Sequence, residues 1–353
     1  MKIKYILSFC LVCSVCFSQI PVGYYNTAAG LTGAPLMSAL HTIIKNHTSI
    51  TYAQLYAAFD STDTKPNGEI WDIYSDIPGS TPPYVYINDS AHRCGNYNSE
   101  ADCFNREHSW PQSWFNGLTP SYSDLFHIYP TDGWVNNKRN NYCYGEVSSP
   151  TWTSLNGSKL GINTTVGYAL TVFEPINEYK GDLARGYFYM STRYMGEDSL
   201  WSTSDATNKS VIEPWEVCVL LKWHHQDTVS TKEINRNNAI YKIQNNRNPF
   251  IDHPEWADSV FTCTLTSIQT ITEPEIKFSI FPNPGNEKVN IIFSSTVSKG
   301  TVHLYNCMGE EMVTQHIQNS SGLQLNLSNL AKGIYIVRIN SGNYSIQKKL
   351  LVE

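Results

Sequence analysis

Residues 105–111 read Asn105-Arg106-Glu107-His108-Ser109-Trp110-Pro111 and place a carboxylate directly beside an imidazole. The segment has the character of a strand that its proline brings to an end. Neighbouring side chains of a strand face opposite sides, so Glu107 and His108 can serve one site only where the chain bends. The segment therefore predicts a polar site at the end of a strand.

Two further segments complete a compact unit with this strand. Residues 123–135 read as a short apolar strand that runs into a turn and then a helix, and a polar, basic cluster follows at 136–141. Such a cluster is a poor candidate for a core. Strand, loop, strand and helix, with Glu-His at the end of the first strand and Asn136 on the helix, predict a ββα unit.

These residue types suit metal-assisted hydrolysis of a phosphodiester. A hard cation such as Mg²⁺ prefers a few oxygen ligands, here a carboxylate and an amide carbonyl, and retains several waters. The cation would neutralise charge on the phosphate. An imidazole of ordinary pKa near 6.5 would take a proton from the attacking water, and an arginine fork would bind the phosphate oxygens.

Other interpretations fit the same residues. A surface Glu-His pair beside an Asn-rich loop would carry no chemistry, and a zinc-dependent hydrolase could use His108, His127 and a carboxylate. The His-Glu-x-x-His pattern of zinc enzymes is absent. His127 lies in an apolar strand and is interpreted as structural. A third alternative is a non-catalytic surface protein that binds glycans through its 22 Tyr and 9 Trp.

The N-terminus predicts export. Lys2 and Lys4 precede an apolar stretch and small residues at Cys16 and Ser18, which is the pattern of a signal peptide over 1–18. No later apolar run approaches the roughly 20 residues of a membrane span, so no stable membrane insertion is expected.

Removing the signal leaves six cysteines, an even number that permits disulfides in an exported chain. Cys94 and Cys103, nine residues apart across a turn-rich loop, are the best-placed pair, and the others are either paired or buried.

The pattern of apolar and turn residues along the chain changes near 265–280. Helical periods mixed with polar loops precede it, and short alternating strands with turn signals follow, which predicts a small β-sandwich over 277–353 after a linker at 265–276.

The signal contributes +2 and the residues from 274 onward another +2, so the net charge of −6 leaves the segment between them near −10. Nucleic acid could not be held there by bulk positive potential, and phosphate binding would have to be local.

The segment from about 24 to 256 resembles the endonuclease I family of secreted and periplasmic bacterial nucleases, which belong to the His-Me finger (ββα-metal) group. The matching segments occur in family order. They are Tyr24-Tyr25, Gly30-Leu31-Thr32-Gly33, Trp71-Asp72-Ile73-Tyr74-Ser75-Asp76, the 105–111 segment, 124–146, 180–190 and Asn246-Arg247-Asn248-Pro249-Phe250. The resemblance implies an α+β fold class, with a ββα-metal nuclease core and surrounding helices in a domain over 19–264.

The resemblance also implies roles for particular residues. His108 would be the general base, and Glu107 and Asn136 the protein ligands of Mg²⁺, for which Mn²⁺ or Ca²⁺ could substitute. Arg139 and Arg185 would contact phosphate, and a Cys94–Cys103 disulfide would brace the approach to the His108 strand. The implied activity is cleavage of DNA, with RNA as a further substrate. Little sequence specificity is expected, because the sequence has no recognisable element for reading bases in a groove, and a monomer is expected. From residue type alone, a basic set consisting of Lys180, Arg185, Arg193, Lys232, Arg236, Lys242 and Arg247 supplies further candidates for binding the nucleic-acid backbone.

The C-terminal segment is similar to a different family. Phe281-Pro282-Asn283-Pro284 at its entry, with Gly333-Ile334-Tyr335-Ile336-Val337 and Lys348-Lys349-Leu350 near its end, resembles the C-terminal sorting domain of the type IX secretion system. The resemblance implies recognition by that machinery and passage across the outer membrane, so that the protein would be secreted or held at the cell surface.

Overall fold

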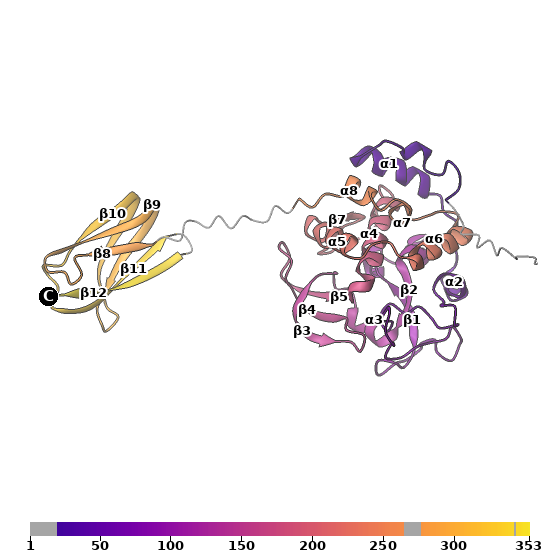
Figure 1. Ribbon diagram of the computed structural model, residues 1–353, viewed down its shortest axis with the longest axis horizontal. Helices are drawn as coiled ribbons and strands as arrows, with labels where there is room; N and C mark the ends of the chain where they lie inside the picture. The colour runs from indigo at the N-terminus through magenta and orange to yellow at the C-terminus, as the bar shows by residue number, and fades with distance from the viewer. Residues whose placement is uncertain (1–19, 265–276, 342–343) are drawn as a thin grey trace, which may run out of the picture. The chain divides into compact units, whose positions relative to one another are not determined.

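The computed structural model describes residues 20–264, 277–341 and 344–353. They belong to two compact units, Met1–Thr266 and Ser267–Glu353 (Figure 1). The expected signal segment and linker lie outside the described residues. Within the described ranges, no helix is long and apolar enough to cross a membrane.

The first unit surrounds α4 (Lys180–Arg193), a helix in which every residue is buried (Figure 1). Its apolar residues pack against α1 and α5. Buried charges require partners, and Asp182, Arg185 and Arg193 of α4 each have one. The remaining α-helices are α1 (Gly33–Ile44), α2 (Leu55–Thr62), α3 (Gly133–Arg139), α5 (Pro214–Gln226), α6 (Thr231–Gln244), α7 (Pro249–Asp252) and α8 (Trp256–Val260).

The strands of this unit form three small antiparallel sheets. β1 (Phe104–His108) pairs with β2 (Ile128–Asp132), so that Glu107 lies opposite Tyr129 and His108 opposite Ile128. β2 leads directly into α3, which contacts both strands, so strand, strand and helix follow one another as the sequence predicts. The other sheets are β3 (Val147–Thr153), β4 (Lys159–Asn163) and β5 (Thr171–Glu174), and β6 (Thr207–Asn208) with β7 (Val211–Ile212).

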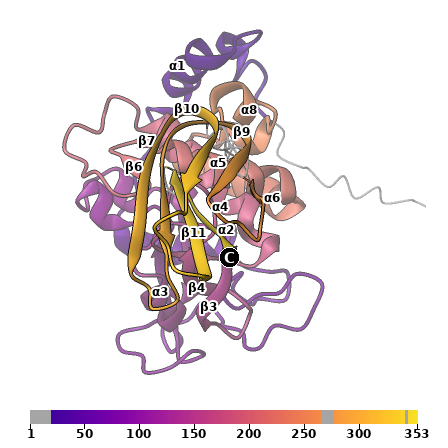
Figure 2. The same cartoon turned by 90° about the vertical axis from the view of Figure 1, so that its left-hand side faces the viewer.

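The second unit is all-β, as predicted, but it is one curled sheet and not a sandwich of two. Its strands are β8 (Phe278–Phe281), β9 (Lys288–Tyr305), β10 (Glu311–Asn326), β11 (Gly333–Ser341) and β12 (Tyr344–Val352), in the order β10-β9-β11-β12 with β8 also on β9. Residues 298–300, whose Ser-Lys-Gly sequence is typical of a turn, lie inside β9. Irregular register between Ser320 and Gly322 lets the long β9–β10 pair bend around one core (Figure 2).

The cysteines follow the expectation for an exported chain. Cys94 and Cys103 form a disulfide with a Cα–Cα distance of 5.1 Å, which confirms the predicted pair. A second disulfide joins Cys218 of α5 to Cys263, 45 residues later, beyond α8. Cys143 is a free thiol in the interior, and Cys307 is a free thiol at the surface.

Candidate active site

Glu107 lies on the face of β1 that α3 covers. The residue is 2% exposed, and its Oε1 accepts a hydrogen bond of 3.1 Å from the Tyr74 hydroxyl. Burial raises the pKa of Glu107 to about 7, although the Arg139 guanidinium and the Tyr74 hydroxyl both oppose this shift. The carboxyl therefore gains or loses its proton close to neutral pH.

Asn136 comes from α3 and meets the same face of β1. Its Nδ2 donates to Oδ1 of Asn105, two residues before Glu107, at 2.7 Å. The amide oxygen of Asn136 thus remains available as an acceptor, and the side chain is only partly buried. Carboxylate and amide oxygens are the donors that a hard divalent cation prefers. Glu107 and Asn136 therefore supply the types of oxygen donor that the expected cation would need.

The imidazole of His108 points to the other face of β1. It stacks on the Tyr52 and Tyr122 rings, with centroids 5.8 and 5.5 Å away. Its Nε2 lies 3.2 Å from the Tyr122 carbonyl oxygen. Because a carbonyl oxygen only accepts, Nε2 carries the proton in this contact and Nδ1 keeps the lone pair. Burial, reinforced by neighbouring His127, lowers the pKa of His108 to about 3, so the imidazole is neutral at pH 7.

Arg139 joins these two faces. Its Nη1 lies 3.3 Å from Oε1 of Glu107 and donates to the His108 carbonyl oxygen at 3.0 Å, while its Nη2 donates to the Ser109 carbonyl oxygen. The side chain is only 1% exposed. These contacts do not support the predicted role as a phosphate contact, because protein oxygens already occupy both terminal nitrogens. Arg139 instead fixes the Glu-His pair to the helix that carries Asn136.

The turn around Asp72, to which the sequence assigned no role, supports the strand and the helix that carry these side chains. Asp72 accepts the backbone N–H of Tyr74 at 2.8 Å and that of Asp132 at 2.9 Å. Asp132 in turn caps α3 by accepting from Val135 N–H. Burial and the neighbouring Asp132 raise the pKa of Asp72 to about 8. The only sequence signal was the match of 71–76 to the family pattern, because the partners of Asp72 lie up to 60 residues away.

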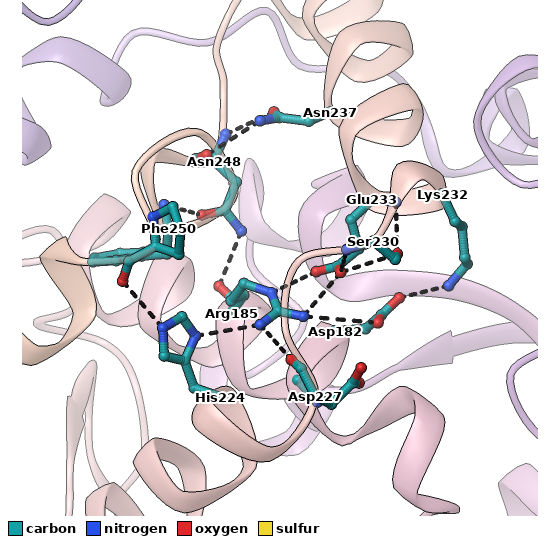
Figure 3. Close-up of polar contacts among 12 residues, drawn as sticks. Asp182, Arg185, His224, Asp227, Ser230, Lys232, Glu233, Asn237, Asn248 and Phe250 are labelled. Atoms are coloured by element: carbon teal, nitrogen blue, oxygen red, sulfur yellow. Dashed lines mark hydrogen bonds and ion pairs between the residues drawn. The ribbon is translucent and has the colours of Figure 1, made fainter.

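Arg185 lies in a separate buried network (Figure 3). Its Nε and Nη2 donate to the two carboxylate oxygens of Glu233 at 2.5 and 2.9 Å, and its Nη1 donates to the Asp227 carbonyl oxygen at 2.9 Å. The side chain has no exposed surface. Glu233 also caps α6 by accepting from the N–H of Ser230. This placement does not support phosphate contact by Arg185 and makes the residue a structural link between α4, α5 and α6.

Most residues of the predicted basic set are also buried and form ion pairs inside the fold. Lys242 is exposed, but each of the other six is buried and pairs with a carboxylate. The pairs are Lys180–Glu174, Arg185–Glu233, Arg193–Glu197, Lys232–Asp182, Arg236–Asp63 and Arg247–Asp252. These six residues are therefore not supported as contacts to the nucleic-acid backbone, because their charges neutralise acidic groups inside the fold.

The zinc alternative finds no support in the geometry. Across the described residues, no group of three or more His, Cys, Asp or Glu side chains is arranged to hold a metal. His127 is completely buried, and its Nε2 lies 2.8 Å from the Ser121 carbonyl oxygen, which agrees with its interpretation as structural. A magnesium site needs fewer protein ligands, because the ion keeps much of its water.

The α+β unit carries a buried glutamate and a neutral histidine on β1 and an asparagine on α3, which are residue types that suit hydrolysis of a phosphodiester. The family model described as Endonuclease I matches residues 32–255, and the chain belongs to this family. The protein is therefore a nuclease, as the resemblance predicted. Residues 279–353 match the secretion system C-terminal sorting domain, which confirms the second resemblance and marks the protein for secretion.

Curated relatives agree with this assignment. The chain is 38% identical over 247 residues to a protein of Bacillus amyloliquefaciens named extracellular ribonuclease, covering 67% of this chain and 78% of the relative. A Bacillus subtilis protein of the same name is 35% identical over 244 residues, with the same coverage. A protein of Buchnera aphidicola subsp. Baizongia pistaciae named Endonuclease-1 is 30% identical over 129 residues, covering 36% of this chain and 46% of the relative.

Proposed function

We propose that this protein is a secreted, divalent-metal-dependent endonuclease that hydrolyses the phosphodiester bonds of DNA, and also of RNA, with little sequence specificity. The observation that carries the proposal is the Arg139 fork, which holds the Glu107 carboxylate and the His108 backbone against the helix that bears Asn136. The names of the relatives include both ribonuclease and endonuclease, which favours a site that reads the phosphodiester and not the sugar.

The proposed mechanism assigns one task to each side chain. Glu107 and Asn136 would hold Mg²⁺, with Mn²⁺ or Ca²⁺ as substitutes. When bound, the cation supplies charge neutralisation at the scissile phosphate and at the leaving oxygen. His108 is the last residue of β1, and the chain bends directly after it, at Ser109. The Nδ1 of His108, which keeps the lone pair because Nε2 donates to the Tyr122 carbonyl oxygen, would accept a proton from the attacking water at this bend. Arg139 is a positioning residue.

Metal removal and loss of the Glu107 carboxylate should have the same effect. We expect the wild-type protein to degrade plasmid DNA and a structureless RNA in Mg²⁺ and to lose activity in EDTA. Glu107→Gln should lower the rate more than about 100-fold, because loss of even an outer-shell partner of a metal costs about 10–100-fold. Initial rates on both substrates measure this. Glu255→Gln, an exposed change, is the matched control. Equal rates for Glu107→Gln and wild type would refute the metal site.

The metal requirement should depend on pH. Because the pKa of Glu107 is raised to about 7, the carboxyl is protonated below neutrality and must lose that proton when a cation binds. The Mg²⁺ concentration that gives half the maximal rate should therefore rise about tenfold per pH unit below 7 and level off above it. His108 stays neutral over this range, since its pKa is lowered to about 3. Magnesium titrations at pH 5.5, 6.5, 7.5 and 8.5 test this, and an identical requirement at all four would contradict it.

A further inference from the structure

Two arginines of the first unit differ from its other arginines in their exposure and in their lack of an ion pair. Residues 20–264 contain seven arginines. Five are buried and paired with carboxylates, namely Arg139, Arg185, Arg193, Arg236 and Arg247. Arg93 and Arg106 are partly exposed, and neither forms an ion pair with a residue in the described ranges. Their positive charges are therefore uncompensated in a segment whose net charge is strongly negative.

Both guanidiniums lie over tyrosine rings, Arg106 between two of them and Arg93 over one. Arg106 Cζ lies 3.7 Å from the Tyr52 ring centroid and 4.3 Å from that of Tyr56, and Arg93 Cζ lies 4.4 Å from the Tyr56 centroid. These four residues, the arginine–tyrosine ladder, form a continuous stack. Cation–π contacts of this kind fix a guanidinium in place while its edge stays open to another partner.

The ladder ends at the candidate general base. The Tyr52 ring, which contacts Arg106, also stacks on the His108 imidazole at 5.8 Å with planes 12° apart. The alternation of β1 accounts for this, because Arg106 and His108 are two residues apart and share a face, while Asn105 and Glu107 share the other. The strand that presents the imidazole therefore presents a guanidinium beside it.

The donors of these arginines are incompletely used. Arg106 donates from Nη1 to the Tyr52 carbonyl oxygen at 2.9 Å, and its Nε is buried with no acceptor in the described structure. Arg93 donates from Nη2 and Nε to Oδ1 of Asn88, at 2.9 and 3.3 Å, and from Nη2 to the Asn88 carbonyl oxygen at 3.5 Å. All of these acceptors are neutral. A fixed, planar guanidinium that lacks an anion is suited to a phosphate, which accepts charge-assisted hydrogen bonds.

We infer that the arginine–tyrosine ladder binds the phosphodiester backbone of the substrate strand beside the scissile bond, with Arg106 contacting the nearer phosphate and Arg93 the farther one. This inference rests on the proposed function, since it names how the same site holds its substrate. It gives Arg106 and Arg93 the role that the sequence assigned to Arg139 and Arg185. It also explains how an acidic unit retains a polyanion, because two local contacts replace a general positive potential.

Salt dependence of binding tests the ladder directly. Affinity for a fluorescent single-stranded oligonucleotide is measured in EDTA across a salt series, with a gel confirming that the oligonucleotide stays intact. Each phosphate contact contributes about 0.7 to the slope of log affinity against log salt for single strands, so Arg106→Met and Arg93→Met should each lower the slope by about that amount. Affinity should fall about tenfold for Arg106→Met, since a hydrogen bond to a charged group is lost. Arg106→Lys should keep the slope, because it keeps the charge.

The controls separate this inference from the proposed function. Lys242→Met removes an exposed charge outside the ladder and should leave the slope unchanged. Melting temperatures identify a variant that fails to fold, and if Arg106→Met does so, Arg93→Met and Arg106→Lys carry the test. Wild-type slopes in both methionine variants would overturn the ladder even if the protein cleaves DNA. Salt-dependent binding through the ladder without cleavage in Mg²⁺ would instead leave the ladder intact and refute the nuclease mechanism.

Discussion

Replacing His108 with alanine is expected to lower the rate of phosphodiester cleavage by about 10²–10⁴-fold, the usual contribution of a positioned general base. The imidazole is neutral at pH 7, and its lone pair is fixed at Nδ1 by the contact between Nε2 and the Tyr122 carbonyl. Alanine leaves the attacking water with no group to accept its proton. Initial rates of plasmid nicking in saturating Mg²⁺ measure the effect.

The control for this variant is another histidine. His225 is exposed and pairs with Asp258, and His225→Ala should retain the wild-type rate. Because alanine also removes a ring from the Tyr52–Tyr122 stack, melting temperatures are needed to show that His108→Ala is folded. A folded His108→Ala protein that digests plasmid at the wild-type rate would rule out His108 as the base.

Arg185→Met is expected to destabilise the first unit by about 3–5 kcal/mol, because it leaves the Glu233 carboxylate buried without its partner. All nine tryptophans lie between residues 71 and 256, so tryptophan fluorescence during denaturant unfolding reports on this unit alone. Lys222→Met is the matched control. Lys222 is 59% exposed and pairs with Glu146 at 3.0 Å, and such a surface pair contributes less than about 1 kcal/mol.

The same variant separates the two roles considered for Arg185. A phosphate contact would give a protein of normal stability with weaker binding of nucleic acid. The buried network instead predicts that Arg185→Met lowers the free energy of unfolding and does not directly weaken the binding of nucleic acid. Equal unfolding free energies for Arg185→Met and wild type would show that the contacts with Glu233 and the Asp227 carbonyl are not important for stability.

Local pattern was sufficient to predict the elements around the site. The proline at 111 predicted that a strand ends near His108, and the apolar strand and turn within 123–135 predicted the helix that carries Asn136. The Cys94–Cys103 disulfide was also predictable, because a short loop with turn residues brings its ends together. In the C-terminal unit the same reasoning found the strands but not their arrangement. Turn residues at 298–300 can also continue through a long, bent strand.

The sequence by itself determined that the chain has a nuclease unit and a β unit, that Glu107 and His108 end a strand, and that Asn136 lies on the helix of the same ββα unit. These features follow from residues close together in the chain, where backbone periodicity fixes which side chains share a face. Only the tertiary structure decided which arginines remain available to a polyanion. A guanidinium is neutralised by whichever carboxylate the fold brings to it, and Arg236 meets Asp63 across 173 residues. Composition and spacing carry no record of such distant pairings, so Arg106 could be distinguished from Arg139 and Arg185 only once their partners were known.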